Sequence, residues 1–372
     1  MRALTVAALL AMTMLGGCAT TPSQLAWQAE VDALVSAQER ASSPGFAVGV
    51  VRDGRLVYSR GVGLANVETG QRIGARSNFR LASVTKQLTT AAILKLYEDG
   101  KLAPHDTLGE VLPGFPAYAN DITIEHLVVH RSGLVDYEDL IPEGQTRQLT
   151  DADVLAMLKA QPKPMFAAGE RFHYSNSGYV LLGLIIEARS GMSFAEYLDS
   201  RIFAPLGMRE TRSYGGESAV IPHRAYGYTV ADNTASRTDQ STTSALLGDG
   251  GVYSSLHDMA RWVASLENDK ILSAASRQRQ FTAVPVPETP GVGYGYGFFI
   301  DRINGHERTW HTGSSIGFRH KLLRFPERDL TVLVLGNINQ GGTPDLADRI
   351  AGIIDPELRV DPATAPKRPV TR

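Results

Sequence analysis

The sequence predicts an α+β fold in which an antiparallel sheet is flanked by N- and C-terminal helices and carries an inserted, mostly helical lobe. Two observations lead to this prediction. β-prone runs occur near both ends of the chain, within residues 46–61 and 295–335, whereas apolar residues between about 105 and 265 recur mostly at helical spacing. Strands from the two ends can complete one antiparallel sheet, with the terminal helices covering a face. The helical insert would form a second lobe, and a cleft between lobes is a preferred place for a ligand site.

The first residues resemble the export signal of a bacterial lipoprotein. Met1-Arg2 supplies a minimal positive start, and residues 3–15 form an apolar stretch that is too short to span a bilayer as a helix. Leu15-Gly16-Gly17-Cys18 then resembles a lipobox that contains the only cysteine of the chain. We expect residues 1–17 to be a lipoprotein signal peptide and Cys18 to carry the lipid. The alternative is a plain secretory cleavage site beside a chance cysteine.

Residues 18–24 are expected to be a tether before one folded domain, residues 25–354. This domain opens with an amphipathic helix over residues 25–40 and a β-hairpin whose turn contains Asp53-Gly54, a strong hairpin signal. A second helix begins near Ser83. The other expected elements are helices at 151–159, 178–189, 194–202, 255–266 and 345–354, strands at 46–51, 56–61, 295–300, 307–311, 318–325 and 330–335, and a disordered tail at 355–372.

The composition is that of an ordinary globular protein. The chain has 372 residues, 43% of them hydrophobic and 20% charged, which excludes a fibre, a disordered chain and a polytopic membrane protein. A formal charge of −2 does not indicate the basic surface that binds nucleic acid. We therefore expect small substrates that are neutral or weakly charged. With one cysteine, neither a disulfide within the chain nor a cysteine-based metal site can form.

Ser83-Val84-Thr85-Lys86 is the candidate nucleophile motif. A serine and a lysine three residues apart at the start of a helix lie on one face, about one turn from each other. The serine hydroxyl becomes a good nucleophile only when a nearby base takes its proton. Lys86 can be that base if burial or a neighbouring positive group lowers its pKa. Alone the motif is weak evidence, because the same spacing recurs by chance in exposed helices.

Two further segments could complete a site around this serine. Tyr174-Ser175-Asn176 precedes an apolar helix, and its tyrosine could act as a tyrosinate base or as a proton shuttle beside a cationic Lys86. Asn176 supplies an amide that can orient the lysine or the substrate. His311-Thr312-Gly313 lies at the end of a predicted strand. A glycine there would let another backbone approach closely, which suits an extended acyl substrate.

Ser-x-x-Lys, Tyr-x-Asn and His-Thr-Gly, in this order, resemble the motifs of the serine β-lactamase and penicillin-binding-protein superfamily. Tyr-x-Asn narrows the resemblance to the branch of class C β-lactamases, D-alanyl-D-alanine carboxypeptidases, D-aminopeptidases and related esterases. The resemblance covers roughly residues 25–354 and extends to residues 122–134 and 250–254. It implies the β-lactamase/transpeptidase-like form of the fold predicted above.

The resemblance also implies roles for individual residues. Ser83 would attack a carbonyl to form an acyl-enzyme, while Lys86 and Tyr174 would share the general-base and general-acid work. The backbone N–H groups of Ser83 and Ser314 would form the oxyanion hole, and Thr312 would bind a substrate carboxylate or polar tail. The implied substrate-binding set also includes Asn176, His311 and Gly313. Water would release the acyl group, and neither a metal nor an organic cofactor would be needed.

His311 bears most directly on the choice of substrate. Many β-lactamases have lysine at the start of this triplet, whereas histidine titrates near neutrality, so attraction for a substrate carboxylate would depend on pH. This difference favours an amide or ester substrate, above all a peptide that contains a D-amino acid. A promiscuous carboxylesterase and a β-lactamase of class C type are alternatives. A penicillin-binding sensor or scaffold with little turnover is an alternative of another class.

The expected partners are a small molecule or a short peptide, such as a peptidoglycan fragment, and no nucleic acid. A membrane would be contacted only through the lipid on Cys18. Ala19, rather than aspartate, follows this cysteine, which by resemblance to such lipoproteins suggests the outer membrane. The folded domain would then face the periplasm as a soluble, tethered body.

Overall fold

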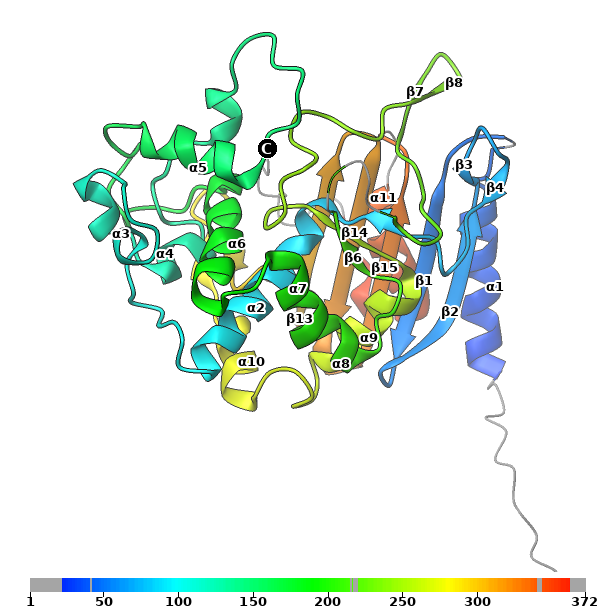
Figure 1. Cartoon of the computed structure of the whole chain (residues 1–372). Helices are drawn as coiled ribbons and strands as arrows, with labels where there is room; N and C mark the ends of the chain where they lie inside the picture. Colours follow the sequence, from blue (N-terminus) through cyan, green and yellow to red (C-terminus); the bar gives the residue numbers. More distant parts are fainter. Residues whose placement is uncertain (1–21, 41, 215, 217–219, 340–342, 362–372) are drawn as a thin grey trace, which may run out of the picture.

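The computed structural model describes residues 22–40, 42–214, 216, 220–339 and 343–361 (Figure 1). The expected signal peptide and the lipid-bearing Cys18 lie outside the described residues. Within the described part, no helix is both long enough and apolar enough to cross a membrane. The structure combines a large antiparallel sheet with a group of helices beside it, which confirms the predicted α+β class.

The main sheet has eight strands in the order β10-β11-β12-β13-β14-β15-β1-β2, and all neighbouring pairs are antiparallel. Near one edge of the sheet Phe46, near the N-terminus, pairs with Gly336, near the C-terminus, so strands from both ends complete one sheet as predicted. The strands are β1 (Phe46–Arg52), β2 (Arg55–Val62), β10 (Val284–Pro285), β11 (Gly293–Tyr294), β12 (Phe299–Ile303), β13 (His306–Ser315), β14 (Phe318–Phe325) and β15 (Leu330–Gly336).

Both faces of β1 and β15 are buried, which explains why these two strands are almost continuously apolar. Alternate side chains point to opposite faces. Val48 and Val50 pack with residues of α1 (Pro22–Ser36) and α11 (Thr343–Ile354). Ala47 and Val51 join the larger core, which includes α9 (Leu256–Ser265). Gly49 lies beneath Leu256 of α9, where a Cβ would come within 3.1 Å of the leucine side chain.

The helical lobe is built around α6 (Asn176–Ser190), which is buried on almost every side. Ser175 caps its N-terminus by accepting a hydrogen bond from the Gly178 N–H, and Gly191 ends it in the left-handed conformation with φ 73°. Besides α9, the segment between the two parts of the main sheet contains the helices α2 (Lys86–Glu98), α3 (Leu108–Val111), α4 (Ile124–Val128), α5 (Asp151–Lys159), α7 (Phe194–Leu198), α8 (Ala204–Leu206) and α10 (Ala274–Gln280).

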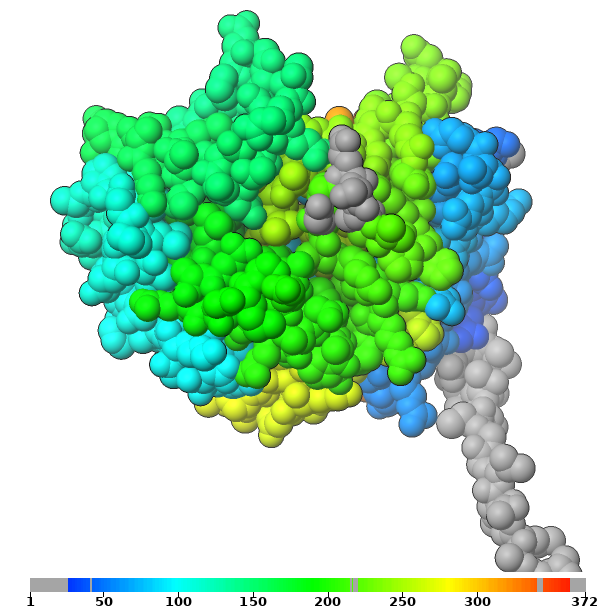
Figure 2. All heavy atoms as spheres, viewed as in Figure 1, coloured from blue at the N-terminus to red at the C-terminus, as the bar shows by residue number. Residues whose placement is uncertain are grey.

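The insert also contains short strands that the sequence analysis did not predict, and one of them pairs with β5 (Phe79–Arg80), a short strand that precedes the insert. β9 (Val252–Ser254) lies between β5 and β6 (Arg212–Ser213) in a small sheet. β7 (Tyr228–Ala231) and β8 (Thr234–Arg237) form a separate hairpin. In Figure 2 this hairpin projects on one side of a hollow in the surface, and the segment that precedes α5 projects on the other. Two short strands, β3 (Leu64–Asn66) and β4 (Gln71–Arg72), form a further two-stranded sheet. Helix α10 (Ala274–Gln280) precedes β10.

Several predicted boundaries differ from the structure. The strand predicted at 307–311 runs from His306 to Ser315, so His311-Thr312-Gly313 lies within it rather than at its end. α1 begins at Pro22 and ends at Ser36, so residues 22–24 are helical rather than tether. The strand predicted at 295–300 begins only at Phe299, because the backbone at Gly297, with φ 81°, packs against the start of α2. The tail is not disordered from residue 355, since residues 356–358 form a 3₁₀ turn and Leu358 is fully buried in the core beside α11. Residues 362–372 lie outside the described part.

Candidate active site

Ser83 lies in a short 3₁₀ helix, η1 (Ala82–Thr85), which runs directly into α2. Ala82 has φ 48°, a left-handed conformation that costs free energy for a residue with a Cβ. This residue turns the chain from β5 into η1 and so presents Ser83 to a cavity of about 170 Å³. The nucleophile motif therefore lies at a tight turn between a strand and a buried helix.

Lys86 is completely buried and its ammonium group touches three oxygen atoms. Its Nζ lies 3.2 Å from Ser83 Oγ, 2.7 Å from Asn176 Oδ1 and 2.9 Å from the main-chain oxygen of Asp249. Burial lowers the pKa of Lys86 to about 8, although the carboxylates of Asp249 and Glu138 oppose the shift. Near physiological pH a fraction of the molecules therefore carries a neutral Lys86, which can accept the Ser83 proton.

Tyr174 is also buried, and its ring lies 5.1 Å from the Lys86 Nζ. Burial raises the pKa of Tyr174 well above its usual value, while the nearby Ser83 hydroxyl lowers it. Its hydroxyl nevertheless makes no hydrogen bond of ordinary geometry with the described residues. The tyrosinate considered in the sequence analysis is therefore disfavoured, and Tyr174 is a neutral phenol that can donate a proton.

Asn176 connects the lysine to an acidic residue that the sequence analysis missed. Its Oδ1 accepts from Lys86, and its Nδ2 donates to Glu138 Oε1 at 2.6 Å. Burial of the carboxyl group raises the pKa of Glu138, even though much of the residue is exposed. Asp249 is more deeply buried; burial raises its pKa, and it accepts a hydrogen bond from Tyr137 at 3.1 Å. Glu138 lies in a short 3₁₀ helix, η3 (Tyr137–Leu140), and Asp249 lies in a loop; neither belongs to a local sequence motif, apart from the Gly-rich run around Asp249.

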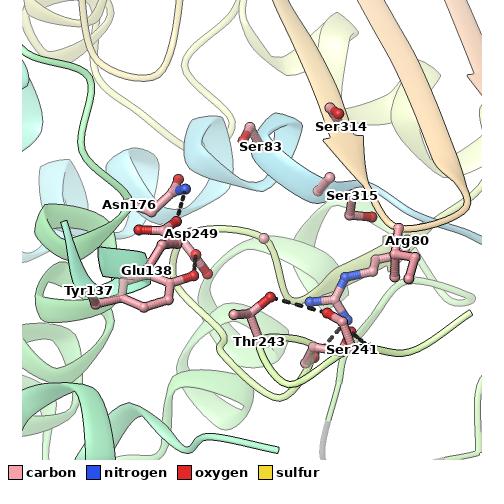
Figure 3. Close-up of a pocket in the computed structure, with 14 residues that line it drawn as sticks. Arg80, Ser83, Tyr137, Glu138, Asn176, Ser241, Thr243, Asp249, Ser314 and Ser315 are labelled. Atoms are coloured by element: carbon pink, nitrogen blue, oxygen red, sulfur yellow. Dashed lines mark hydrogen bonds between the residues drawn. The ribbon is translucent and has the colours of Figure 1, made fainter. Parts of the chain in front are cut away.

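Figure 3 shows the cavity with Ser83 and Ser314 on one rim and polar side chains below them. The two serines whose backbone N–H groups were predicted to form the oxyanion hole thus border the same cavity. Thr312 and His311 do not line it. Among the described residues, no group of three or more His, Cys, Asp or Glu side chains is arranged to hold a metal ion. The other lining residues are Arg80, Ala82, Tyr137, Glu138, Asn176, Ser241, Thr243, Ser244, Asp249, Gly250, Ser315 and Ile316.

Comparison with known proteins agrees with this geometry. Residues 31–354 match the family model described as Beta-lactamase. The chain belongs to the beta-lactamase family. Penicillin-binding protein 4* of Bacillus subtilis (strain 168) is 32% identical over 299 residues, which are 76% of this chain and 66% of the relative. A D-aminopeptidase of Gluconobacter oxydans (strain 621H) is 29% identical over 329 residues, 84% of this chain and 59% of the relative.

The chain is also similar in structure to the octameric penicillin-binding protein homologue from Pyrococcus abyssi. It superimposes with a TM-score of 0.79 at 27% identity and covers 88% of this chain and 77% of that chain. This likeness confirms the β-lactamase/transpeptidase-like fold that the sequence motifs implied. The chain spans less than two thirds of the length of both curated relatives.

Within this beta-lactamase-family chain, His311 differs from the prediction. Its side chain is fully buried, and burial together with the Lys86 charge lowers its pKa to about 3. Nδ1 lies 2.6 Å from the Thr312 carbonyl oxygen and must donate to it, so Nε2 accepts from the Tyr294 hydroxyl at 3.3 Å. His311 is therefore neutral near physiological pH. The predicted titration near neutrality, with its pH-dependent attraction for a carboxylate, was wrong because the sequence does not reveal burial.

Gly313 has a different neighbour from the predicted one. A Cβ at this position would overlap the Leu81 carbonyl oxygen and come within 2.9 Å of His320. The backbone that approaches this glycine is thus the segment leading into η1, rather than a substrate. β12 pairs with β13 only as far as Trp310, so η1 packs against the part of β13 beyond that residue. The absence of a side chain at Gly313 sets the distance between Ser83 and β13.

We expect Gly313→Ala to slow acylation of Ser83 by about a hundredfold, because the added methyl group must displace η1 by a distance on the order of 1 Å. The measurement is the rate of labelling by a fluorophosphonate probe. Gly74→Ala is a matched control, since a Cβ there meets nothing within 4 Å. Equal labelling rates for Gly313→Ala and the unmodified protein would show that η1 does not depend on this glycine.

Proposed function

We propose that this chain is a serine hydrolase that cleaves a small amide or ester, preferably an amide of a D-amino acid, through an acyl-enzyme on Ser83. One observation carries the proposal: the Ser83 hydroxyl lies at the rim of a cavity, 3.2 Å from a buried lysine whose pKa is about 8. Few other roles explain a lysine buried without a carboxylate in contact with it beside an accessible serine.

The proposed reaction uses groups already in place. Neutral Lys86 takes the Ser83 proton as the hydroxyl oxygen adds to the substrate carbonyl. The backbone N–H groups of Ser83 and Ser314 stabilise the resulting oxyanion. As the carbon–nitrogen bond breaks, the leaving amine takes a proton from the Tyr174 phenol, which recovers one from protonated Lys86. Water then adds to the ester and restores Ser83.

The acidic side of the cavity supports a substrate with an amino group close to the scissile carbonyl. The carboxylates of Glu138 and Asp249 line the cavity near Asn176, and an α-ammonium group would give them a positive partner. The D-aminopeptidase among the relatives supports the D configuration. The name of penicillin-binding protein 4* supports a second candidate, acylation by penicillin with slow turnover.

The test compares D-alaninamide, L-alaninamide and p-nitrophenyl acetate as substrates of the purified protein, with Ser83→Ala as the control. We expect the D-amide to be hydrolysed at least tenfold faster than the L-amide. With the scissile carbonyl at Ser83, only one of the two enantiomers can direct its ammonium group toward Glu138 and Asp249. Turnover of the ester alone would favour an esterase. A stable penicillin adduct in intact-protein mass spectrometry, without turnover of either amide, would favour the penicillin-binding role.

A further inference from the structure

The Tyr174 hydroxyl is a proton donor that no hydrogen bond of ordinary geometry holds in place. The residue is buried, yet this hydroxyl has no such partner among the described residues. Its position therefore depends on the backbone of Tyr174 and on the groups that pack against its ring. A displacement on the order of 1 Å in an active site can lower a rate by about a hundredfold. The residues that fix this backbone and this ring thus bear directly on proton transfer.

His130 contacts Tyr174 in both ways. The main-chain oxygen of His130 accepts a hydrogen bond from the His173 N–H at 2.8 Å, and its Nδ1 accepts one from the Ser175 N–H at 3.1 Å. These two N–H groups lie on either side of Tyr174 in the chain. The imidazole also packs against the Tyr174 ring, with the ring centres 4.3 Å apart. The centres of the other aromatic rings beside Tyr174 lie 6.1 to 6.4 Å away.

The backbone of His130 adopts a conformation that glycine would adopt more easily. α4 ends in a Schellman motif, in which the His130 N–H donates to the Leu127 carbonyl oxygen. The Arg131 N–H donates in the same way to the His126 carbonyl oxygen. His130 stands where this motif most often has glycine, and its φ is 58°. A side chain at such a φ costs free energy that glycine does not, so the helix end does not call for a histidine.

The imidazole carries a second cost. Because Nδ1 accepts from the Ser175 N–H, the proton of the neutral ring is on Nε2. His130 is 1% exposed, and its Nε2 has no hydrogen-bond partner among the described residues. Burial and the charge of Lys86 lower the pKa of His130 well below its usual value, so the ring is neutral. A buried N–H without an acceptor is unfavourable, so packing alone would favour an apolar side chain here.

Histidine supplies what neither glycine nor an apolar residue has, an acceptor at the δ position together with a flat ring. We propose that His130 is a positioning residue for Tyr174: its carbonyl oxygen and Nδ1 hold the N–H groups on both sides of the tyrosine, and its ring supports the phenol. His130 does not line the cavity and transfers no proton. The inference rests on the proposed hydrolase function, in which the Tyr174 phenol protonates the leaving amine.

The experiment uses a difference between two leaving groups. The nitrogen of D-alaninamide must take up a proton as it leaves, whereas p-nitrophenyl acetate releases p-nitrophenolate as an anion and needs no acid. We expect Tyr174→Phe to lower kcat/KM for the amide by about a hundredfold to ten-thousandfold, the range for general acid catalysis. The value for the ester should stay within about tenfold. The ratio of the two values therefore reports how well the Tyr174 proton is delivered.

His130→Gly suits the helix end but removes Nδ1 and the ring. It should lower kcat/KM for the amide by about tenfold to a hundredfold and leave the ester within about threefold. His130→Asn retains an acceptor at the δ position and tolerates the left-handed backbone, so the amide should stay within about fivefold of the unmodified value. In the Tyr174→Phe background His130→Gly should have no further effect, because the two residues act as one unit.

Phe172→Leu is the matched control. Its ring packs against the same imidazole, with the centres 5.7 Å apart, but its side chain makes neither of the two hydrogen bonds that flank Tyr174. The ratio of amide to ester turnover should stay within about twofold of the unmodified value. Fluorophosphonate labelling of Ser83, which expels fluoride and needs no acid, verifies that each variant retains its nucleophile.

Three results would overturn the inference. The first is an equal loss for amide and ester in a folded His130→Gly, and the second is a further loss when this change is added to Tyr174→Phe. The third is a His130→Asn variant as slow on the amide as Tyr174→Phe, a measurement that decides even if His130→Gly fails to fold.

The hydrolase proposal survives each of these results, because it fails only if Ser83→Ala retains turnover or if no substrate is turned over. A protein that turns over the ester alone would remain a hydrolase but would overturn the inference, since it expels no amine for Tyr174 to protonate. Loss of all turnover would overturn both.

Discussion

Ser83→Ala is expected to lower the rate of amide or ester hydrolysis by about four to six orders of magnitude, because no other group in the cavity replaces the nucleophile. The hydroxyl of Ser314 borders the same cavity but lies on β13, away from Lys86, which touches Ser83 instead. Steady-state turnover and covalent labelling by a fluorophosphonate probe should disappear together.

Ser314→Ala is the matched control for this prediction. The proposed contribution of Ser314 is its backbone N–H, which the substitution retains, so labelling of Ser83 should stay within about tenfold of the unmodified rate. Undiminished labelling of Ser83→Ala would mean that another residue is the nucleophile, and peptide mapping of the adduct would identify it.

Lys86→Met is expected to reduce kcat/KM by about a thousandfold, the typical effect of removing a general base, while preserving most of the side-chain volume. In the unmodified protein kcat/KM should rise with pH and level off above about 8, because only neutral Lys86 accepts the Ser83 proton. The variant should lose this rise. Lys95→Gln, on the same helix but paired with Glu98 near the surface, should keep both the rate and the pH profile.

A second readout of Lys86 does not depend on catalysis. Its pKa is lowered from 10.5 to about 8 in the folded chain, so the unfolded chain binds more protons between these values. The free energy of unfolding should therefore rise by up to roughly 3 kcal/mol as pH increases from about 8 to 10.5, and the cost of the buried charge should be fully present below about 8. Denaturant titrations of Lys86→Met should lack this rise; a rise of equal size in the variant would contradict the assignment.

Local spacing made the centre of the site predictable. Ser83 and Lys86 are three residues apart at a helix start, so helical geometry alone brings them together, and Asn176 begins the apolar helix that reaches them. β1 and β15 were equally predictable, because strands buried on both faces are continuously apolar.

The remainder of the site depends on tertiary packing that no local pattern records. Arg80, Glu138 and Asp249 belong to separate segments and share no spacing, so only the folded chain places them around one cavity. His311 was identified as a site residue, but its burial, and therefore its charge, depends on strands and aromatic rings elsewhere in the sequence. The short turn after α11 was missed because Leu358 stands among charged residues and prolines, without the recurring apolar spacing that marks a helix.

The pairing of β1 with β15 has a consequence for the order in which the chain becomes functional. β1 and the serine-bearing η1 are synthesised early, whereas β13, which supplies one rim of the cavity, emerges more than two hundred residues later. Contacts between such distant segments form late and slow down folding. A nascent chain that carries Ser83 and Lys86 therefore has no finished cavity, and the centre is assembled only when the C-terminal strands add to the sheet.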